Sequence, residues 1–519
     1  MKSSGRVRFS AIPSSVAIQL FVAFFVIYAI TSSGGLEDAD SEMRYRTAQS
    51  WLDGEGGALP LSLGPIAVPG RGGREFSFYG PLQSVLMTPF VALSRLVARA
   101  NAEHLFKLVF GVLVIPAISA LSLAILFRAL RALRFAERAA FCAVVVIGLA
   151  TPLWHYGRSG QEENIIGLAF ALYLWGMALL FRNRFEGLML IALTASIIVA
   201  TRWSYLPTLF IILIPVAWLL WQRRADWGTW WRNLVIGSAL ASAVAGMVFW
   251  YNTYRFGRPF ETGYGVYYNQ LHPPFFTFAA TPSHMAALMF SPYRGIIWFC
   301  PALLVLVGLR NVAKGSPYTR LWKATLGAWL FTWIFIASYS VWNAGAAWGP
   351  RFFVALIVLL APAFAAVFGS GQRWRALIAI SLSVQFCSTV LPSSSEDFVY
   401  DVRNLAHPGD CNPWSCGCTA LCLRGPWALR AIGNTIASRP LPVIDLNSSA
   451  KTPGGASPLA TSDFNSVYWW PVRAAYRARK LSPSLAFALC MLVLSAAFCT
   501  LWFCYRRLPV SPGAARPAS

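Results

Sequence analysis

Charged residues are scarce in this chain. Only 12% of its 519 residues are Asp, Glu, Lys or Arg, whereas a soluble domain carries about 25%. So few charges cannot cover a water-exposed surface, and hydrophobic residues make up 57% of the sequence. The apolar segments recur along the whole length, with no evident internal repeat or long low-complexity tract. We therefore expect one large membrane domain covered by lipid, not an anchor attached to a soluble head.

Acidic residues are the scarcer sign, with 20 Asp and Glu against 43 Lys and Arg, and the net charge is +23. In a soluble protein that balance would suggest nucleic acid. Here most basic residues lie in short clusters between apolar runs, where they contact lipid head groups and set topology. No basic domain stands apart from the membrane, so we exclude nucleic acid as a partner.

The positive-inside rule orients the chain. The basic start, residues 1–8, precedes a long apolar run that we interpret as an uncleaved first span leaving the cytoplasm. If 81–98 and 104–127 both crossed, the basic run 128–138 would lie outside, so 81–98 is expected to be interfacial or re-entrant. We predict an all-α, polytopic transmembrane bundle of about twelve spans with both ends cytoplasmic. The predicted spans are 13–31, 104–127, 139–155, 165–181, 187–201, 205–221, 233–251, 295–309, 324–340, 352–369, 376–392 and 483–504.

Three regions follow from this topology. Residues 1–392 form a transmembrane core of eleven spans, whose first outer loop, 32–80, is the expected catalytic loop. Residues 393–482 form an extracytoplasmic region, and 483–519 are the last span with a cytoplasmic tail. Side chains suited to chemistry are concentrated in the outer loops, so we expect the protein to act on the non-cytoplasmic side.

The ten cysteines divide into two groups. Six lie in or beside predicted helices and are expected to be packing residues; they are Cys142, Cys300, Cys387, Cys490, Cys499 and Cys504. The other four crowd the last outer loop, and an oxidising compartment would pair them as two disulfides of open connectivity; they are Cys411, Cys416, Cys418 and Cys422. A zinc site is one alternative, although this spacing fits no common ligand pattern, and free thiols are the other.

Two acidic pairs are candidates for catalysis. Asp40 and Glu42 follow the first span, and Glu162 and Glu163 lie at the outer mouth of the helix predicted at 165–181. Carboxylates at a membrane surface can serve as a general base or hold a divalent metal ion. The alternatives are that acids are merely tolerated in outer loops, or that Glu162 and Glu163 cap a helix dipole.

Basic residues at the outer face oppose the orientation rule. Arg202 lies at a hairpin turn, Arg294 follows Ser-Pro-Tyr, and Arg351 follows Trp-Gly-Pro. A guanidinium at head-group level suits the phosphate of a lipid, although ordinary snorkelling to lipid phosphates is the alternative. Two outer segments rich in aromatics and glycine, 254–268 and 339–348, are either an interfacial belt or shaped loops that bind sugar.

The chain resembles the C-type membrane glycosyltransferases, and is similar to bacterial relatives of protein O-mannosyltransferases and aminoarabinose transferases. The resemblance covers most of the chain and rests on short motifs. These are Asp40-Ser41-Glu42-Met43-Arg44-Tyr45, Phe78-Tyr79-Gly80-Pro81-Leu82, Thr201-Arg202, and Tyr339-x-x-Trp342-x-x-Gly345-x-x-x-Gly349-Pro350-Arg351, together with Phe256-Gly257-x-Pro259 and Thr262-Gly263-Tyr264.

The resemblance implies a donor sugar on a polyprenyl phosphate or pyrophosphate and an acceptor hydroxyl that a loop carboxylate deprotonates or orients. The implied catalytic residues are Asp40, Glu42, Glu162 and Glu163. The implied substrate-binding residues are Arg44, Tyr45, Tyr79, Arg202, Arg294, Trp342 and Arg351. A divalent metal is implied near Asp40 and Glu162. Ser41 separates two acids that are often adjacent in the family, which leaves the choice between Asp40 and Glu42 open.

We expect a multi-pass protein of a bacterial inner membrane that moves a sugar from the lipid donor to a glycan, lipid or protein acceptor. A transporter or flippase of a lipid-linked sugar is one alternative. Such proteins place charges within their spans and often show two related halves, and the predicted spans here are nearly free of charge. A surface-polysaccharide polymerase or ligase is the other alternative, since it shares the lipid-linked donor and a large late loop.

Overall fold

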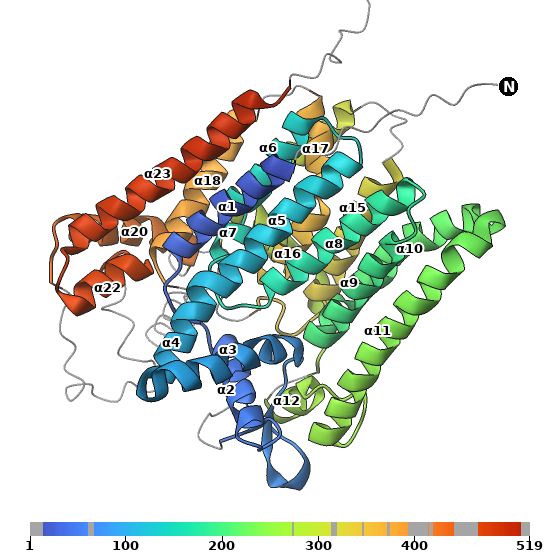
Figure 1. Ribbon diagram of the computed structural model, residues 1–519, viewed down its shortest axis with the longest axis horizontal. Coiled ribbons are helices and arrows are strands. Elements are labelled where there is room, and N and C mark those ends of the chain that lie inside the picture. Colours follow the sequence, from blue (N-terminus) through green and yellow to red (C-terminus); the bar gives the residue numbers. More distant parts are fainter. Residues whose placement is uncertain are drawn as a thin grey trace, which may run out of the picture.

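The computed structural model describes residues 14–60, 67–271, 274–312, 319–344, 347–370, 374–392, 414, 419–440 and 465–509. Long helices run side by side along one tilted direction, and shorter helices gather at one end of them (Figure 1). The bundle helices are α1 (Ser14–Thr31), α5 (Ile115–Ala132), α6 (Glu137–Leu149), α8 (Glu163–Phe181), α9 (Gly187–Thr201), α10 (Leu206–Gln222), α11 (Trp227–Phe256), α15 (Thr319–Ala337), α16 (Val354–Leu359), α17 (Ala361–Gly369), α18 (Arg375–Val390) and α23 (Pro483–Arg507).

Shorter helices and turns connect this bundle. The α-helices are α2 (Ala39–Leu52), α3 (Leu82–Ala98), α4 (Ala102–Val109), α7 (Leu153–Tyr156), α12 (Tyr264–Leu271), α13 (Thr281–Phe290), α14 (Ile296–Phe299), α20 (Ala420–Ile436) and α22 (Trp470–Ala478). The 3-10 segments are η2 (Arg71–Gly73), η3 (Arg99–Asn101), η5 (Trp203–Tyr205), η6 (Arg224–Asp226), η7 (Phe278–Ala280), η8 (Pro301–Asn311) and η9 (Arg351–Phe353), and η4 (Phe110–Val114) is a π-helical segment.

The helical, membrane-embedded character predicted from composition is confirmed. Within the described residues, five helices are long and apolar enough to cross a membrane, or six if the bent pair formed by η9 with α16 and α17 is one span. Each of the twelve predicted ranges overlaps helical structure, but several of these helices are short, and the count of about twelve spans stays a prediction. The range 295–309 is mostly a 3-10 helix, and the range 352–369 bends by 55°.

α8 is the centre of the bundle. It packs against α5, α9 and α16, and nearly all of its side chains are buried. The outer helices instead expose large apolar side chains, such as Phe210 of α10, Met247 of α11 and Leu492 of α23, each at least 61% exposed. Apolar side chains that face outward along a whole helix require lipid around them. The protein is therefore an integral membrane protein.

α3, which covers the ambiguous apolar run 81–98, lies across the end of the bundle beside α2, and does not run alongside α5 (Figure 1). This is the arrangement expected of an interfacial segment. It continues through η3, α4 and η4 into α5, so the chain turns into the bundle only after residue 101.

The loop between α1 and α3 departs from the all-α prediction. It contains a small antiparallel sheet of order β1-β3-β2, built from β1 (Ala58–Leu59), β2 (Ala67–Pro69) and β3 (Glu75–Ser77). Ala58 pairs with Phe76, and Ala67 pairs with Ser77. The sheet leads directly into residues 78–81, which form one wall of the cavity described below.

The late outer region contributes α20 and α22, which pack beside α18 and α23 at the same end as α2 (Figure 1). Cys422 in α20 is disulfide-bonded, and the predicted connectivity with Cys411, Cys416 and Cys418 lies outside the described residues. The six cysteines predicted to be packing residues are free thiols. The regional boundaries at 392 and 483 remain predictions.

Candidate active site

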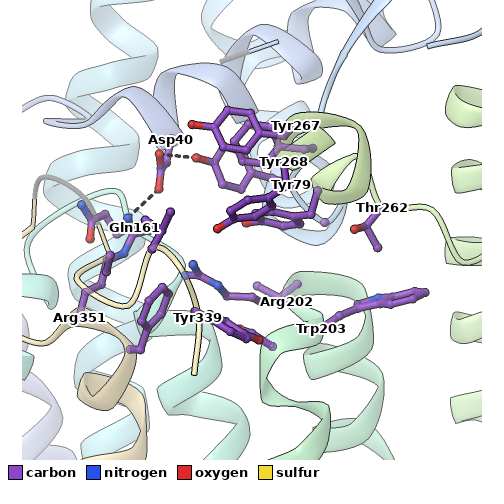
Figure 2. Close-up of a pocket in the computed structure, with 18 of the residues that line it drawn as sticks. Asp40, Tyr79, Gln161, Arg202, Trp203, Thr262, Tyr267, Tyr268, Tyr339 and Arg351 are labelled. Carbon is purple, nitrogen blue, oxygen red and sulfur yellow. Dashed lines mark hydrogen bonds and ion pairs between the residues drawn. The ribbon is translucent and has the colours of Figure 1, made fainter. Parts of the chain in front are cut away.

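A cavity of about 500 Å³ opens at the end of the bundle, between α2, the residues 78–81, the start of η5, the end of α11 and α12 (Figure 2). Side chains from segments more than 300 residues apart line it, including Asp40 and Arg351. These segments are the predicted outer loops, so the structure brings loops expected on one side of the membrane to one end of the bundle.

α2 places Asp40 and Arg44 on a single face. Asp38 caps the helix, since its Oδ1 accepts a hydrogen bond of 2.8 Å from the backbone N–H of Ser41 and its Oδ2 accepts one of 2.8 Å from the Ser41 hydroxyl. Asp40 therefore lies in the first turn of α2, and Arg44 follows four residues later on the same face. Asp40 lines the cavity, while Arg44 is buried behind it.

The loop 158–164 brings two carboxylates beneath α2. Gly160 lies against Ser41 and Leu36, where a Cβ would come within 3.0 Å of the Leu36 carbonyl oxygen. The side-chain amide of Gln83 in α3 also donates to the Gly160 carbonyl. This close contact holds Glu162 and Glu163 at the start of α8, where both are buried. They support the cavity from behind and do not line it.

Arg202 enters the cavity from the turn between α9 and η5 (Figure 2). Gly80 lies against the last carbonyls of α9, and a Cβ there would collide with the carbonyl oxygens of Ala200 and Thr201. Only glycine allows the 78–81 segment to approach this helix end so closely. The approach sets Tyr79 and Arg202 on the same cavity.

Hydrogen bonds from two tyrosine hydroxyls fix the backbone on either side of Arg351. The Tyr156 hydroxyl donates to the Trp348 carbonyl at 3.0 Å, and the Tyr205 hydroxyl donates to the Phe352 carbonyl at 2.9 Å. Arg294, predicted to bind substrate, donates from Nη1 to the Ala347 carbonyl and at 3.4 Å to that of Gly349. Arg294 therefore braces the segment that leads to Arg351.

Three arginines and three carboxylates form one ion-pair network. Arg44 Nη2 lies 2.5 Å from Glu162 Oε2, and Arg202 Nη1 lies 2.8 Å from Glu162 Oε1 and 3.4 Å from Glu163 Oε1. Arg351 joins Glu163 Oε1 at 2.6 Å to Asp40 Oδ2 at 2.7 Å. The Tyr79 hydroxyl donates to the other oxygen of Asp40.

The pKa values of the two carboxylates that line the cavity, Asp38 and Asp40, are shifted in opposite directions. Burial alone would raise the pKa of Asp40, but the guanidinium groups of Arg351 and Arg44 and the Tyr79 hydrogen bond hold that pKa below its ordinary value. Burial, followed by repulsion from Asp40, raises the pKa of Asp38 to about 7. The lowered pKa favours the ionised form of Asp40 at the cavity surface.

Two arginines that line the cavity, Arg202 and Arg351, have guanidinium nitrogens that donate to no described residue. Nη1 of Arg202 donates to Glu162 and Glu163, and neither Nε nor Nη2 donates a hydrogen bond to a described residue. The side chain of Arg202 is 11% exposed, and its guanidinium stacks over the Phe352 ring at 4.6 Å. The buried Nη2 of Arg351, which also lines the cavity, lacks a partner as well.

Aromatic side chains form much of the remaining wall. The residues that share this feature are Phe78, Tyr79, Trp203, Tyr264, Tyr267, Tyr268, Phe275, Tyr339 and Phe352. The sequence indicated two of the contributing segments, 254–268 and 339–348, as aromatic outer loops, but not the residues that face the cavity. Asp38, Gln161 and Asn252 also line it without having been singled out. The capping pattern Asp38-x-x-Ser41 ahead of a helix was the available signal for Asp38.

Two predicted residues of α2 lie on another face. Glu42 forms ion pairs of 2.9 Å with Arg46 and 2.8 Å with Lys107, and Tyr45 stacks on Phe106 with ring centroids 4.6 Å apart. Two residues of a helix correspond to about 200° of rotation, so Glu42 cannot share the cavity face of Asp40. Trp342 stacks on His284 at 4.9 Å, also away from the cavity, and Gly345 of the same motif lies outside the described residues.

The residues predicted to bind a metal do not fit one in this arrangement. Both oxygens of Glu162 are bound by arginines, and those of Asp40 are bound by Arg351 and Tyr79. Within the described residues no group of three His, Cys, Asp or Glu side chains could hold a metal ion. A metal at Asp40 or Glu162 would have to displace a guanidinium, and metal dependence remains a prediction.

The chain is similar to solved structures, among them two of ArnT from Cupriavidus metallidurans. No family model and no curated protein matches the chain. The crystal structure of ArnT from Cupriavidus metallidurans in the apo state is similar over 94% of this chain and 76% of that chain, with a TM-score of 0.47 and 13% identity. The structure of ArnT from Cupriavidus metallidurans bound to undecaprenyl phosphate is similar over 96% of this chain and 78% of that chain, with a TM-score of 0.45 and 12% identity.

Proposed function

We propose that this protein is a membrane glycosyltransferase that moves a sugar from a polyprenyl-phosphate donor to an acceptor hydroxyl, on the non-cytoplasmic side of a bacterial inner membrane. One observation carries this proposal. A single cavity holds an ionised carboxylate, Asp40, and a guanidinium with free donors, Arg202, beside a wall of tyrosines. The motif resemblance described above points to the same chemistry.

Arg202 is the group suited to the donor phosphate. Its Nη1 is fixed by Glu162 and Glu163, so its other nitrogens point into the cavity without a loss of side-chain freedom on binding. Two free nitrogens of one guanidinium can bind two phosphate oxygens in parallel. The position at the end of the bundle also matches the head-group level of a lipid, whose chain would remain in the membrane.

The tyrosine wall suits the sugar. Tyr264, Tyr268 and Tyr339 present rings and hydroxyls to the cavity beside Arg202. An aromatic ring covers the apolar face of a sugar, while the hydroxyls can form hydrogen bonds with its polar edge. The cavity volume of about 500 Å³ is within the range of ordinary small-molecule sites.

Asp40 is the group suited to the acceptor hydroxyl. Each carboxylate oxygen accepts more than one hydrogen bond, so Asp40 can orient a hydroxyl while it remains bound to Tyr79 and Arg351. In the proposed reaction the hydroxyl oxygen forms a bond to the anomeric carbon as the bond from that carbon to the phosphate oxygen breaks. The lipid phosphate leaves with the electron pair, and the hydroxyl proton passes to Asp40.

The low pKa of Asp40 is compatible with this role if proton transfer is late. Glycosyl transfer passes through an oxocarbenium-like transition state. The acceptor oxygen becomes strongly acidic only as its new bond forms, so a carboxylate of low basicity can then accept the proton. In the transition state the same carboxylate charge also stabilises the positive charge that develops on the sugar.

The proposal is tested by reconstituting the full chain in proteoliposomes with a panel of polyprenyl-phosphate sugars and following sugar transfer to added acceptors. Transfer should be abolished by Asp40→Ala, whereas Glu42→Ala is the matched control on the same helix and should retain wild-type transfer. Sugar movement across the bilayer without loss of its phosphate bond would instead identify a flippase. Equal transfer by wild type and Asp40→Ala would refute the proposed site.

A further inference from the structure

A second cavity lies at the opposite end of the bundle, between α6, α17, α18 and α23, with a volume of about 540 Å³. We propose that it is a binding site for an anionic phospholipid of the cytoplasmic leaflet, whose acyl chains fill the cavity. The site is separate from the transfer site at the other end of the bundle and does not depend on the proposed function.

The walls of this cavity are apolar. They include Val145, Leu149, Ile378 and Phe498. The polar groups at its inner end are satisfied within the protein, because the Ala150 carbonyl accepts a hydrogen bond of 2.6 Å from the Ser381 hydroxyl. The indole Nε1 of Trp374 is a buried lining group that lacks a hydrogen-bond partner within the described residues, but a single donor is too few for an ordered water, which needs about two to four polar partners. Within a membrane, a hydrocarbon chain is the occupant that such walls favour.

The cavity has the depth of a single leaflet. Its lining on α6 extends from Phe141 near the end of the bundle to Leu149, a rise of about 12 Å at 1.5 Å per residue. Half of a typical hydrocarbon core is about 15 Å thick. An acyl chain that enters from the membrane surface therefore ends near the floor formed by Ala150.

Arginines surround the mouth of the cavity. Arg375, the first residue of α18, lines it directly. The guanidinium of Arg506 lies over the Trp502 ring at 4.7 Å, and that of Arg138 lies over the Tyr505 ring at 5.3 Å, and both rings line the cavity. None of these three arginines forms an ion pair with a described residue.

The positive charge of the arginines at the cavity mouth favours a negatively charged lipid head group. Glu137, the acid at the start of α6, is already paired with Arg131 at 3.6 Å. This end of the bundle carries the basic clusters that the orientation rule places in the cytoplasm, where anionic lipids are attracted to Arg and Lys. Aromatic rings beneath the guanidinium groups match the interface between head group and acyl chain. The charge complementarity thus favours an anionic lipid over a neutral one.

The test uses the full chain purified in detergent, delipidated, and mixed with equal amounts of phosphatidylglycerol and phosphatidylcholine that carry identical acyl chains. Native mass spectrometry then counts retained lipids. We expect wild type to retain one phosphatidylglycerol. Ile378→Trp, which fills the cavity, should lose it, whereas Leu489→Trp on the exposed face of α23 is the control and should not.

The head-group contribution is tested by the double variant Arg375→Gln/Arg506→Gln. Its preference for phosphatidylglycerol over phosphatidylcholine should fall by about thirtyfold, the contribution of two basic residues at an anionic head group. Arg184→Gln, an exposed arginine elsewhere at this end, is the control and should keep the preference. Unchanged melting temperatures establish that the variants are folded.

Retention of neither lipid by wild type, equal retention of both, or equal retention by wild type and Ile378→Trp would each overturn the proposal. If Ile378→Trp does not fold, the arginine double variant decides the question by itself. Sugar transfer is not a readout of this experiment, so its result does not affect the function proposed above.

Discussion

Two groups of buried arginines lie at the same end of the molecule and bind different partners. In the ion-pair network of the candidate site, Arg44, Arg202 and Arg351 bind carboxylates beside a cavity. In the second group, Arg158 and Arg424 both donate to the backbone carbonyls of Ser388 and Leu391, where α18 ends. Arg158 also pairs with Glu37 at 2.9 Å, and both side chains are at most 1% exposed.

The partners distinguish the two roles. The last carbonyls of a helix lack intrahelical donors, and the arginines of the second group supply donors to the end of α18. These arginines thereby attach α20 and the loop 158–164 to the bundle. The arginines of the candidate site instead orient side chains around the cavity. In this protein, buried arginines bound to backbone carbonyls hold helices and loops together. Those shared between carboxylates orient the side chains at the cavity.

The largest expected effect is the loss of transfer when the ion-pair network beside the cavity is changed at Asp40. Asp40→Asn should reduce the rate of transfer by about 10²–10⁴-fold, the usual contribution of a general base. Because the pKa of Asp40 is lowered, the carboxylate is ionised throughout about pH 5 to pH 9, so the loss should be constant over that range. The check is the ratio of wild-type to variant rates at each pH. A ratio that varies with pH would show that another group accepts the proton.

The lowered pKa of Asp40 also predicts the direction in which the stability of the protein changes with pH. A lowered pKa in the folded state contributes stability above the ordinary value of 3.8, and this contribution disappears as the pH falls. The melting temperature of wild type should therefore approach that of Asp40→Asn on acidification from about pH 6 to about pH 3. A difference that grows on acidification would contradict the sign of the shift.

The second expected effect is a loss of stability when one of the arginines that bind the end of α18 is replaced. Arg158→Met removes the guanidinium from the buried Glu37 carboxylate and should destabilise the protein by about 3–5 kcal/mol. Transfer by the folded fraction should stay within about twofold of wild type. Denaturant unfolding followed by tryptophan fluorescence measures the first quantity. The double variant Glu37→Gln/Arg158→Met should recover part of the loss, because it leaves no buried charge behind.

A smaller effect is expected from Arg202→Lys. The ammonium retains the charge but cannot bind two phosphate oxygens with a planar fork, so the KM for the lipid donor should rise by about tenfold with a smaller change in kcat. Arg184→Lys, an exposed arginine at the other end of the bundle, should change neither constant. A reduced kcat with unchanged KM would place the contribution of Arg202 in the transition state.

The smallest effect is expected on metal removal. The oxygens of Asp40 and Glu162 are already bound by arginines and Tyr79, so a chelator should change the transfer rate by less than about twofold. Assays with and without EDTA measure this. Loss of transfer on chelation, with recovery on addition of a divalent ion, would show that the network rearranges to admit a metal.

The apolar runs predicted the bundle because lipid-facing helices need continuous hydrophobic sequence, and the basic clusters predicted which loops share an end. The break after Leu359 was less apparent in the hydropathy, although Pro362 removes a backbone donor at this point. The small sheet after α2 has strands too short to produce an alternating pattern. The separation of Asp40 from Glu42 could have been predicted from the helical period once residues 39–52 were identified as a helix.

The pairing of particular arginines could not be predicted. Arg202, Arg294 and Arg351 occupy similar outer turns in the sequence, yet Arg294 binds backbone carbonyls while the other two bind carboxylates. Each choice depends on contacts between residues 39 to 311 positions apart in the sequence, which no local pattern contains.

The equal numbers of arginines and carboxylates in the network have a consequence for product release. The network of Asp40, Glu162 and Glu163 with Arg44, Arg202 and Arg351 carries no net charge. In the proposed reaction a phosphodiester with one negative charge becomes a phosphomonoester with up to two at neutral pH. In that reaction the network itself adds no surplus positive charge to hold the additional negative charge, so it does not oppose departure of the spent lipid carrier.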